Sequence, residues 1–381
     1  MKRITLIVVI LIIVVVIGFQ FITSQQPPAI SASIIGLQAS NDITGYARAT
    51  SVRAFKFPDD HGPHPEFQTE WWYYTGNLDA ADGRHFGYQL TFFRRAITPT
   101  EISRASDWAT NQIYFAHFAL TDGKNNTHEA TERFSRGAAG LAGATGNPFR
   151  VWLENWSAVG TFNETSLQAD DAGRALNLTL TSLKPIVLQG DRGLSQKSPD
   201  VGNASYYYSF TRLATTGTVT VNGEQLTVTG TSWMDHEWST AVLGENAVGW
   251  DWFSIQLSDQ RELMLFQIRQ KDGSIEPLSS GTLVEPDGST KHLTRDQFKI
   301  ETLSTWKSDR TGATYPASWN IALPSEDIQL TLQPYIADQE MRVSIIYWEG
   351  AVSVRGQSNS GPVRGNGFVE MTGYAQMNGG Q

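Results

Sequence analysis

Two short segments of this 381-residue chain combine acidic, histidine and tryptophan side chains closely enough for acid–base chemistry. In the segment SWMDHEWS, Asp235, His236 and Glu237 stand between two tryptophans. Successive side chains of a strand point to opposite faces, so Asp235 and Glu237 share one face and His236 shares the other with Trp238. A carboxyl group and an imidazole beside indole rings suit acid–base work on an apolar molecule, and the rings would stabilise a transient carbocation. The alternative interpretation is a salt-bridge node that fixes a strand end.

The second segment, HPEFQTEWWYYTGNL, places Glu70 directly before four aromatic residues. Strand alternation sets Glu70, Trp72 and Tyr74 on one face. If this face lines the interior of a barrel, burial raises the pKa of Glu70, as a proton donor requires. In the alternative interpretation, Glu70 pairs with Arg94 or Arg95 and fixes the packing.

Three further residues are candidates for ligand binding: His117 in IYFAHFALTD, and Trp250 and Trp252 in GWDWF. A lone histidine on a strand is more often a hydrogen-bonded core residue than a catalyst, so His117 matters only if it converges with other polar groups. His61 and His64 are close in the segment HGPH, but two prolines make this segment extended and the spacing gives no recognised zinc set. We therefore expect no bound metal and no cofactor.

The composition excludes several classes of function. Charged residues make up 18% of the chain and the net charge is -9, so nothing attracts the phosphate backbone of a nucleic acid. The chain has no cysteine, which excludes disulfides, thiolate metal sites and cysteine nucleophiles. No Walker loop, dinucleotide fingerprint, G-x-S-x-G elbow or H-E-x-x-H motif occurs. With 12 Trp, 12 Tyr and 18 Phe, the composition favours aromatic walls or a ligand cavity.

Strand signals dominate the chain from about Phe55 onward and predict an all-β protein. Short β-branched or aromatic runs such as VTVNGEQLTV alternate with turns rich in Gly, Asn and Asp. Residues 72–94 and 252–269 share an order: an aromatic strand, an Asp-containing turn, and an apolar strand that ends in Arg. This echo indicates two similar barrels or sandwiches in tandem, with chance similarity of two hairpins as the alternative. We place the two domains at 51–240 and 241–381.

The N-terminal residues predict a membrane anchor. Lys2 and Arg3 precede about nineteen residues without a charge, close to the roughly 20 that span a bilayer and longer than the core of a secretory signal. We expect an anchor or signal segment over 1–24 and a stalk over 25–50. The positive pair would stay cytoplasmic and place the folded part on the extracytoplasmic side of the cell membrane. A cleaved signal, which would give a secreted or periplasmic protein, is the alternative.

In these segments the sequence resembles the AttH-like and carotenoid 1,2-hydratase (CrtC) proteins. The resemblance rests on the ordered segments HPEFQTEWWYYTGNL, YQLTFFRR, YFAHFALTD, SWMDHEWS followed by GWDWFSIQL, and ELMLFQIR before DGS, and it covers the chain from about Phe55 to the end. It implies two tandem lipocalin-like (calycin-type) β-barrels with the ligand site near their contact, and hydration of an isolated C=C bond without a cofactor. The histidine-x-tryptophan element of the hydratases matches His236 and Trp238, with Asp235 and Glu237 around them. Their Tyr-x-Asp element has no clear counterpart after GWDWF.

We therefore expect a membrane-tethered protein that binds a lipid or isoprenoid ligand. As an enzyme it would resemble a hydro-lyase: Asp235 or His236 protonates an alkene, Trp238 and Trp250 shield the cation, and a carboxylate positions water. The alternative is a non-enzymatic lipid-binding or carrier module associated with an ABC transporter of the cell envelope, in which SWMDHEWS only fixes the two barrels against each other. A third hypothesis, hydrolysis of an ester or glycan, lacks a recognisable nucleophile or carboxylate pair.

Overall fold

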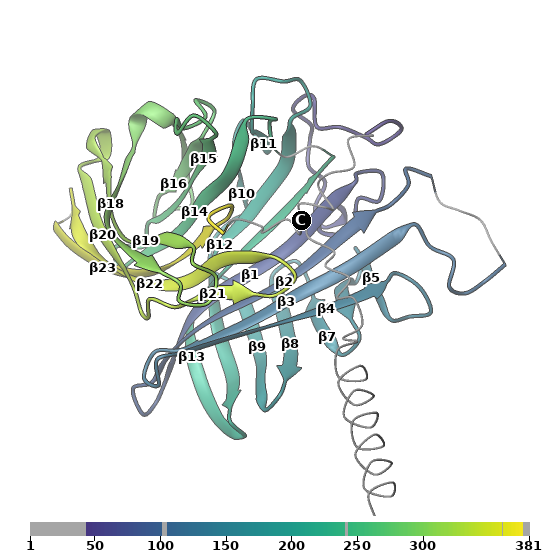
Figure 1. Ribbon diagram of the computed structural model, residues 1–381, viewed down its shortest axis with the longest axis horizontal. Coiled ribbons are helices and arrows are strands. Elements are labelled where there is room, and N and C mark those ends of the chain that lie inside the picture. The colour runs from purple at the N-terminus through teal and green to yellow at the C-terminus, as the bar shows by residue number, and fades with distance from the viewer. Residues whose placement is uncertain (1–42, 101–104, 241–242, 360, 376–381) are drawn as a thin grey trace, which may run out of the picture. The chain divides into compact units, whose positions relative to one another are not determined.

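The computed structural model describes residues 43–100, 105–240, 243–359 and 361–375, and the strands of these residues form two sheets (Figure 1). The predicted all-β fold class is confirmed. Within these ranges no helix has the length and apolar character needed to cross a bilayer. The anchor predicted over 1–24 lies outside the described residues and stays a prediction.

The first sheet contains thirteen strands, whose main path runs β4-β3-β2-β1-β13-β12-β9-β8-β7-β6-β5, while β10 and β11 pair with β12. The sheet is nearly closed, because β2, β3 and β4 all contact β6. A short 3-10 helix, η1 (Asp59–His61), precedes β1. The strands are β1 (Thr69–Ala80), β2 (His85–Ala96), β3 (Gln112–Asp122), β4 (Thr127–Arg136), β5 (Ala142–Thr145), β6 (Phe149–Leu153), β7 (Trp156–Gly160), β8 (Glu164–Asp171), β9 (Arg174–Ser182), β10 (Val187–Leu188), β11 (Leu194–Gln196), β12 (Ala204–Val221) and β13 (Glu224–Ser239).

The second sheet contains ten strands in the order β17-β16-β15-β14-β23-β22-β20-β19-β18, with β21 paired to β22. Two 3-10 helices, η2 (Arg295–Gln297) and η3 (Pro324–Glu326), connect its strands. The strands are β14 (Ala247–Leu257), β15 (Glu262–Gln270), β16 (Ser280–Val284), β17 (Thr290–Thr294), β18 (Lys299–Lys307), β19 (Thr314–Leu323), β20 (Ile328–Pro334), β21 (Glu340–Arg342), β22 (Ile346–Ser358) and β23 (Gly361–Met371).

Both sheets are built in the same order around their first strand. In the first sheet β1 pairs with β2 and with the last strand, β13. In the second sheet β14 pairs in the same way with β15 and with the last strand, β23. The hairpins β1–β2 and β14–β15 are the two segments whose sequences echo each other. The shared order therefore supports two similar units in tandem.

The boundaries of the packed part differ slightly from those expected. Residues 43–50 belong to the predicted stalk, yet they contact the first sheet: Tyr46 Oη donates to the carbonyl oxygen of Ala96 at 3.0 Å. The packed part thus begins earlier than position 51. The chain passes from the first sheet to the second between Ser239, the end of β13, and Ala247, the start of β14.

Alternation along the strands divides the aromatic residues between two environments. Trp72 and Tyr74 of β1 lie in the core that the first sheet encloses. Tyr73, between them, lies on the outer face with Trp233 of β13, in a cluster that packs against Phe368 of the second sheet. The outer face of the first sheet therefore contacts the second sheet, through β1, β2, β4 and β12.

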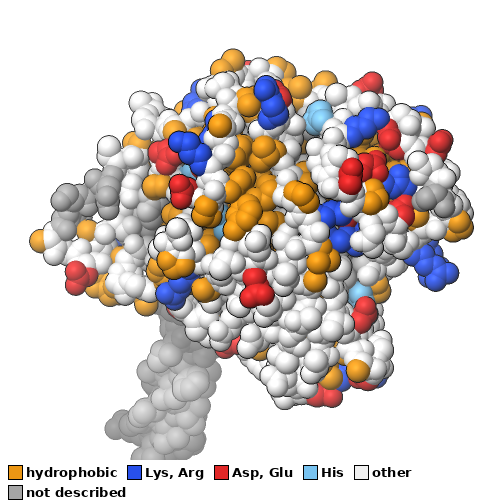
Figure 2. Space-filling view, turned by 180° about the vertical axis from the view of Figure 1, so that it is seen from behind, with side chains coloured by type: hydrophobic (Ala, Val, Ile, Leu, Met, Phe, Trp, Pro, Cys, Tyr) orange, Lys and Arg blue, Asp and Glu red, His pale blue; other side chains and the backbone are white. Residues whose placement is uncertain are grey.

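One face of the molecule carries both apolar and charged side chains on its surface. Figure 2 shows apolar side chains gathered near the middle of this face, with acidic and basic side chains interspersed around them. No patch of a single charge dominates the face, so it offers no electrostatic footprint for a phosphate backbone.

The contact between the sheets contains two acidic side chains for which the described residues show no salt bridge. Glu349 of β22 and Glu370 of β23 stand directly opposite each other in register. One oxygen of Glu349 accepts from Tyr73 Oη at 2.6 Å, and the other has no partner among the described residues. Glu370 accepts from Trp250 Nε1 at 3.1 Å. Burial, together with the neighbouring Glu370, raises the pKa of Glu349 well above its usual value, and burial raises the pKa of Glu370 to about 8.

These raised pKa values predict that stability falls as the pH rises. Between about pH 4.5 and pH 8 the two carboxyl groups are ionised in the unfolded chain but still bind protons in the folded protein, so rising pH favours unfolding. Glu349→Gln removes one of them. We expect the variant to lose less stability than the wild type between pH 5 and pH 8, with a melting temperature at pH 8 higher by on the order of 3 °C. Circular dichroism melts would measure this.

The matched control is Glu301→Gln, because Glu301 is exposed on β18 of the same sheet. It should keep the wild-type pH dependence. Identical pH dependence in Glu349→Gln and the wild type would contradict the assignment of a proton to Glu349.

Candidate functional site

The register of β1 and β13 brings the two chemistry-bearing segments together. Glu70 stands opposite Trp238, and Trp72 stands opposite His236. All four side chains are fully buried, and the Trp72 ring stacks on the His236 ring with centroids 4.8 Å apart. The faces predicted from strand alternation therefore meet inside the first sheet.

Glu70 is the centre of this site. Its Oε1 accepts from His64 Nδ1 at 2.8 Å and from His236 Nε2 at 2.9 Å, while its Oε2 accepts from Arg94 Nε at 2.7 Å. Burial alone would raise the pKa of Glu70, but the Arg94 charge and the hydrogen bonds from His236 and His64 hold it well below its usual value. Glu70 is thus a carboxylate and not the proton donor that burial in an aromatic wall suggested. The pairing with Arg94, the alternative interpretation, is present.

His64 carries a positive charge beside this carboxylate. Its Nε2 lies 3.3 Å from Asp60 Oδ1, so both ring nitrogens face carboxylates and both hold protons. Burial would lower the pKa of His64, but the hydrogen bonds to Asp60 and Glu70 outweigh burial and raise it. The ring is stacked on Trp238, with centroids 3.7 Å apart. The HGPH segment therefore supplies an imidazolium to the site.

A chain of hydrogen bonds leads from Glu70 to His61. The Glu70 carboxylate only accepts, so His236 Nε2 carries a proton. Burial lowers the pKa of His236 to about 4, so the ring is neutral and its Nδ1 accepts from Tyr208 Oη at 3.0 Å. Tyr208 Oη in turn accepts from Nδ1 of His61, whose pKa burial lowers to about 3. This pattern leaves the Nε2 of a neutral His61 as a free base.

His61 stands in the wall of a narrow cavity inside the first sheet. The cavity has about 220 Å³ of empty space, which includes open solvent, with room for about one water-sized sphere. Its lining consists of His61, Tyr74, Phe162, Asn163, Thr165, Leu180, Phe210, Leu213 and Met234. The hydrogen-bonded histidines therefore end at a mostly apolar cavity.

Phe162 partly closes this cavity. It lies in the connection between β7 and β8 and packs against the rings of Phe57, His61 and Phe210. Ligand pockets are usually about 300–1,000 Å³. A larger ligand therefore has to displace Phe162.

Comparison with known proteins shows the family of the chain. The AttH-like family model matches residues 48–374. The chain belongs to the AttH-like family. The resemblance seen in the sequence is thereby confirmed.

Solved structures agree with this assignment. An AttH candidate from Nitrosomonas europaea is 36% identical, with a TM-score of 0.77 over 86% of this chain and 99% of that protein. Kievitone hydratase from Nectria haematococca has a TM-score of 0.65 at 14% identity, over 86% of this chain and 98% of that one. CghA, solved with Sch210972, has a TM-score of 0.51 at 16% identity, over 80% of this chain and 88% of that one. At such identities these last two show a shared fold. No curated protein matches the chain.

Asp235 of this AttH-like protein lies on the opposite face of the first sheet from His236. Asp235 accepts from Tyr207 Oη at 2.7 Å, from Ser209 Oγ at 2.5 Å and from Trp233 Nε1 at 2.7 Å. Burial raises its pKa to about 7 despite these hydrogen bonds. Trp252 donates to the same tyrosine at 3.2 Å. Asp235 and the adjacent His236 therefore do not form one acid–base pair, because the sheet separates them.

Three other candidates also have structural partners between or beside the sheets. Glu237 pairs with Lys197 Nζ at 3.1 Å. His117 is held between Tyr347 Oη at 2.7 Å and Glu132 Oε2 at 2.9 Å. Trp250 Nε1 donates to the carboxyl group of Glu370 on β23. None of the three lines the cavity.

Three atoms of the network have the types and spacing of metal ligands. His64 Nδ1, a Glu70 oxygen and a His236 ring nitrogen all lie within 4.8 Å of one another, a donor set that suits zinc. Each of these groups is already hydrogen bonded within the set, and the Arg94 guanidinium supplies a positive charge at Glu70. We therefore assign the three residues to the hydrogen-bond network.

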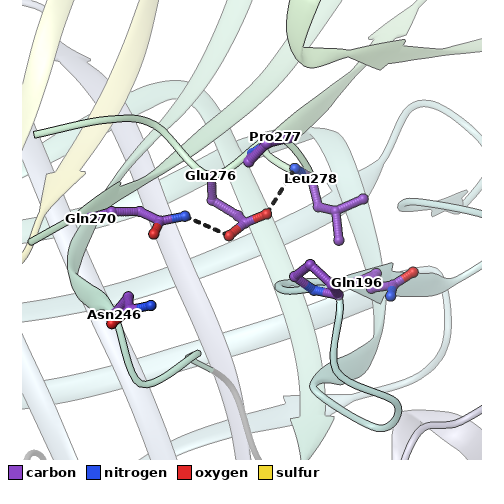
Figure 3. Close-up of a pocket in the computed structure, with 7 residues that line it drawn as sticks. Gln196, Asn246, Gln270, Glu276, Pro277 and Leu278 are labelled. Atoms are coloured by element: carbon purple, nitrogen blue, oxygen red, sulfur yellow. Dashed lines mark hydrogen bonds between the residues drawn. The ribbon is translucent and has the colours of Figure 1, made fainter. Parts of the chain in front are cut away.

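A larger depression opens elsewhere on the AttH-like protein (Figure 3). It is wide and open to solvent, with about 1050 Å³ of empty space that includes bulk solvent. Its one carboxylate, Glu276, accepts from Gln270 Nε2 at 2.7 Å and from the Leu278 backbone N–H at 3.4 Å. No member of the histidine network lines it, so the cavity beside His61 is the better candidate site.

Sequence reasoning missed Tyr208 and Asp60, and it considered His61 and His64 only as metal ligands. Tyr208 occurs within ASYYYSF on β12, and only the pairing of β12 with β13 sets it opposite His236. The signal that would have found Tyr208 is its alternation with Tyr206, which also packs into the enclosed core.

Removing Arg94 tests whether the Glu70 charge depends on it. Arg94→Ala leaves a buried carboxylate without its guanidinium and should lower the free energy of unfolding by about 3–5 kcal/mol. Arg95→Ala is the matched control, because Arg95 is also buried but its guanidinium makes one hydrogen bond, to Thr69 Oγ1 at 3.3 Å. The control should cost about 1 kcal/mol. Equal losses in urea denaturation would show that Arg94 does not neutralise Glu70.

The protonation pattern of the histidines is directly measurable. In ring-nitrogen NMR, His61 and His236 should stay neutral from about pH 5 to pH 8, because burial lowers their pKa values to about 3 and about 4. His64 should remain protonated above its usual value of 6.5. Protonation of His61 near pH 6.5 would rule out its role as a neutral base.

Proposed function

We propose that this AttH-like protein binds an apolar, unsaturated molecule inside the first sheet and reversibly adds water to it, without a cofactor. The observation that supports this is the hydrogen-bonded chain that runs from Glu70 through His236 and Tyr208 to the free nitrogen of His61 at the cavity. The similar fold of kievitone hydratase supports a hydratase-type reaction as an analogy of fold.

In this proposal His61 moves the proton. Its Nε2 takes a proton from water while the water oxygen bonds to one alkene carbon and the π electrons of the double bond are displaced away from that carbon. The other carbon then takes the same proton from His61, and this electron pair forms the new C–H bond. While His61 holds the extra proton, its ring carries a positive charge. Its Nδ1–H donates to Tyr208, Tyr208 donates to His236, and His236 donates to Glu70, so this chain of hydrogen bonds connects the positive charge to the Glu70 carboxylate. General acid–base catalysis of this kind contributes typically 10²–10⁴-fold.

The other predicted residues have supporting roles in the proposal. Trp72 stacks on His236 and Trp238 stacks on His64, and these contacts hold the imidazole rings in place.

We propose that the finer fold is two lipocalin-like barrels in tandem, as the shared strand order supports. We also propose that residues 1–24 tether the protein to the cell membrane with its sheets on the extracytoplasmic side. The apolar and uncharged character of that segment supports this.

Binding without turnover is the second candidate function. The complete burial of Glu70 and His236 favours it, because a carrier needs an enclosed apolar interior but no reactive group in contact with the ligand. In this case the histidine network would only fix the strands. Association with an envelope transporter belongs to this candidate.

The first experiment is to purify the full-length protein, extract it with organic solvent and identify co-purifying molecules by mass spectrometry. A neutral unsaturated lipid or isoprenoid supports the proposal and supplies a substrate. A protein that carries no such molecule and takes up none when offered would contradict both candidate functions.

Two histidine variants separate catalysis from carriage. With the ligand so identified, His61→Ala and His236→Ala should each lower turnover by about 10²-fold or more, since each breaks the chain that ends at the cavity. Binding should change little, because the apolar walls remain. His292→Ala, at an exposed position of β17, should leave both unchanged. Unchanged turnover in His61→Ala would discard the mechanism, and turnover absent from the wild type would favour the carrier.

A further inference from the structure

The hydroxyl of Tyr74 is a buried polar group without a partner. Tyr74 is 1% exposed and lines the cavity, and its Oη has no hydrogen bond within the described residues. Tyr88, on the neighbouring strand of the same core, shows the usual arrangement: its Oη and Ser232 Oγ are 2.7 Å apart in a hydrogen bond. An unpaired buried hydroxyl is costly, and an acceptor on a ligand in the cavity would satisfy it.

We propose that the ligand is a neutral α,β-unsaturated carbonyl compound whose carbonyl oxygen accepts a hydrogen bond from Tyr74. This inference rests on the proposed function and names its substrate class. It differs from the isolated C=C bond that the resemblance to carotenoid hydratases implied.

The chemistry of the cavity favours a conjugated over an isolated alkene. Water activated by a neutral base adds to an alkene only where the displaced electron pair is stabilised. In a conjugated carbonyl compound, His61 Nε2 takes a proton from water, the water oxygen bonds to the β-carbon, and the π electrons move onto the carbonyl oxygen as an enolate. Tyr74 Oη donates to this oxygen, where negative charge develops. Proton transfer from His61 to the α-carbon restores the carbonyl group.

The lining of the cavity also excludes charged ligands. Apart from His61, which is neutral, the lining contains no ionisable side chain other than the tyrosine. A carboxylate or phosphate head group would find no cation there, and burying it unpaired is costly. The apolar remainder of the ligand would pack against Leu180, Leu213 and Met234, which line the cavity.

Two probes with the same skeleton test the carbonyl requirement. Benzalacetone is a small conjugated ketone, and its partner is the diene in which a methylene group replaces the carbonyl oxygen. Isothermal titration of the full-length protein should show roughly fivefold to tenfold tighter binding of the ketone. Tyr74→Phe should remove this preference, whereas Tyr88→Phe should keep it. A preference that survives in Tyr74→Phe would overturn the inference.

Melting temperatures of the ligand-free variants provide an independent readout. Tyr74→Phe loses no hydrogen bond and should melt at or above the wild-type temperature, whereas Tyr88→Phe loses its bond to Ser232 and should melt lower. Equal destabilisation would mean that Tyr74 has a partner, and the inference would fall. Equal binding of ketone and diene by the wild type would also overturn it but leave an apolar ligand site intact. Binding of neither probe would contradict the proposed function itself.

Discussion

The buried charge of Glu70 constrains the rest of the first sheet. A carboxylate removed from water costs several kcal/mol unless cations and hydrogen bonds replace its hydration. Here Arg94 from β2, His236 from β13 and His64 from the chain before β1 supply them together. Each must be correctly placed for the others to be satisfied, so this one group fixes the register of three strands and the path of the N-terminal segment. It also helps to raise the pKa of His64, and its acceptor oxygen places a proton on His236 Nε2.

The same strands serve two surfaces because their side chains alternate. On β13, His236 and Trp238 face the enclosed core, while Asp235 faces the second sheet. Hydrogen bonds on this outer face connect the sheets: Trp252 of the second sheet donates to Tyr207, and Tyr73 donates to Glu349 of the second sheet. The segment SWMDHEWS therefore contributes its residues to two separate environments, one on each face of the sheet, although in the sequence it resembles a single catalytic motif.

Sequence patterns predicted the parts of this arrangement that depend on local periodicity. The all-β class, the common face of Glu70 and Trp72, and the separation of His236 from Asp235 all follow from a period of two. The sign of the Glu70 pKa shift could not be predicted, because it depends on whether Arg94 lies next to the carboxylate after folding. Tyr208 and His61 join the site through a strand pairing and through the short helix η1, and both depend on contacts distant in sequence. The echo between the two hairpins was a weak signal, yet it corresponds to the shared strand order of the two sheets.

Fold similarity alone does not choose between adding water to isolated and to conjugated double bonds. Protonating an isolated alkene requires a strong acid at the ligand, and the groups in contact with this cavity are weak acids: His61 is neutral, and burial raises the pKa of Tyr74 above its usual value. Glu70 is ionised and His64, though protonated, is absent from the cavity lining. A site with a free imidazole base and an unpaired hydroxyl donor is instead suited to an electron-poor alkene. The protonation states that burial gives His61 and Tyr74 therefore favour addition of water to a conjugated double bond.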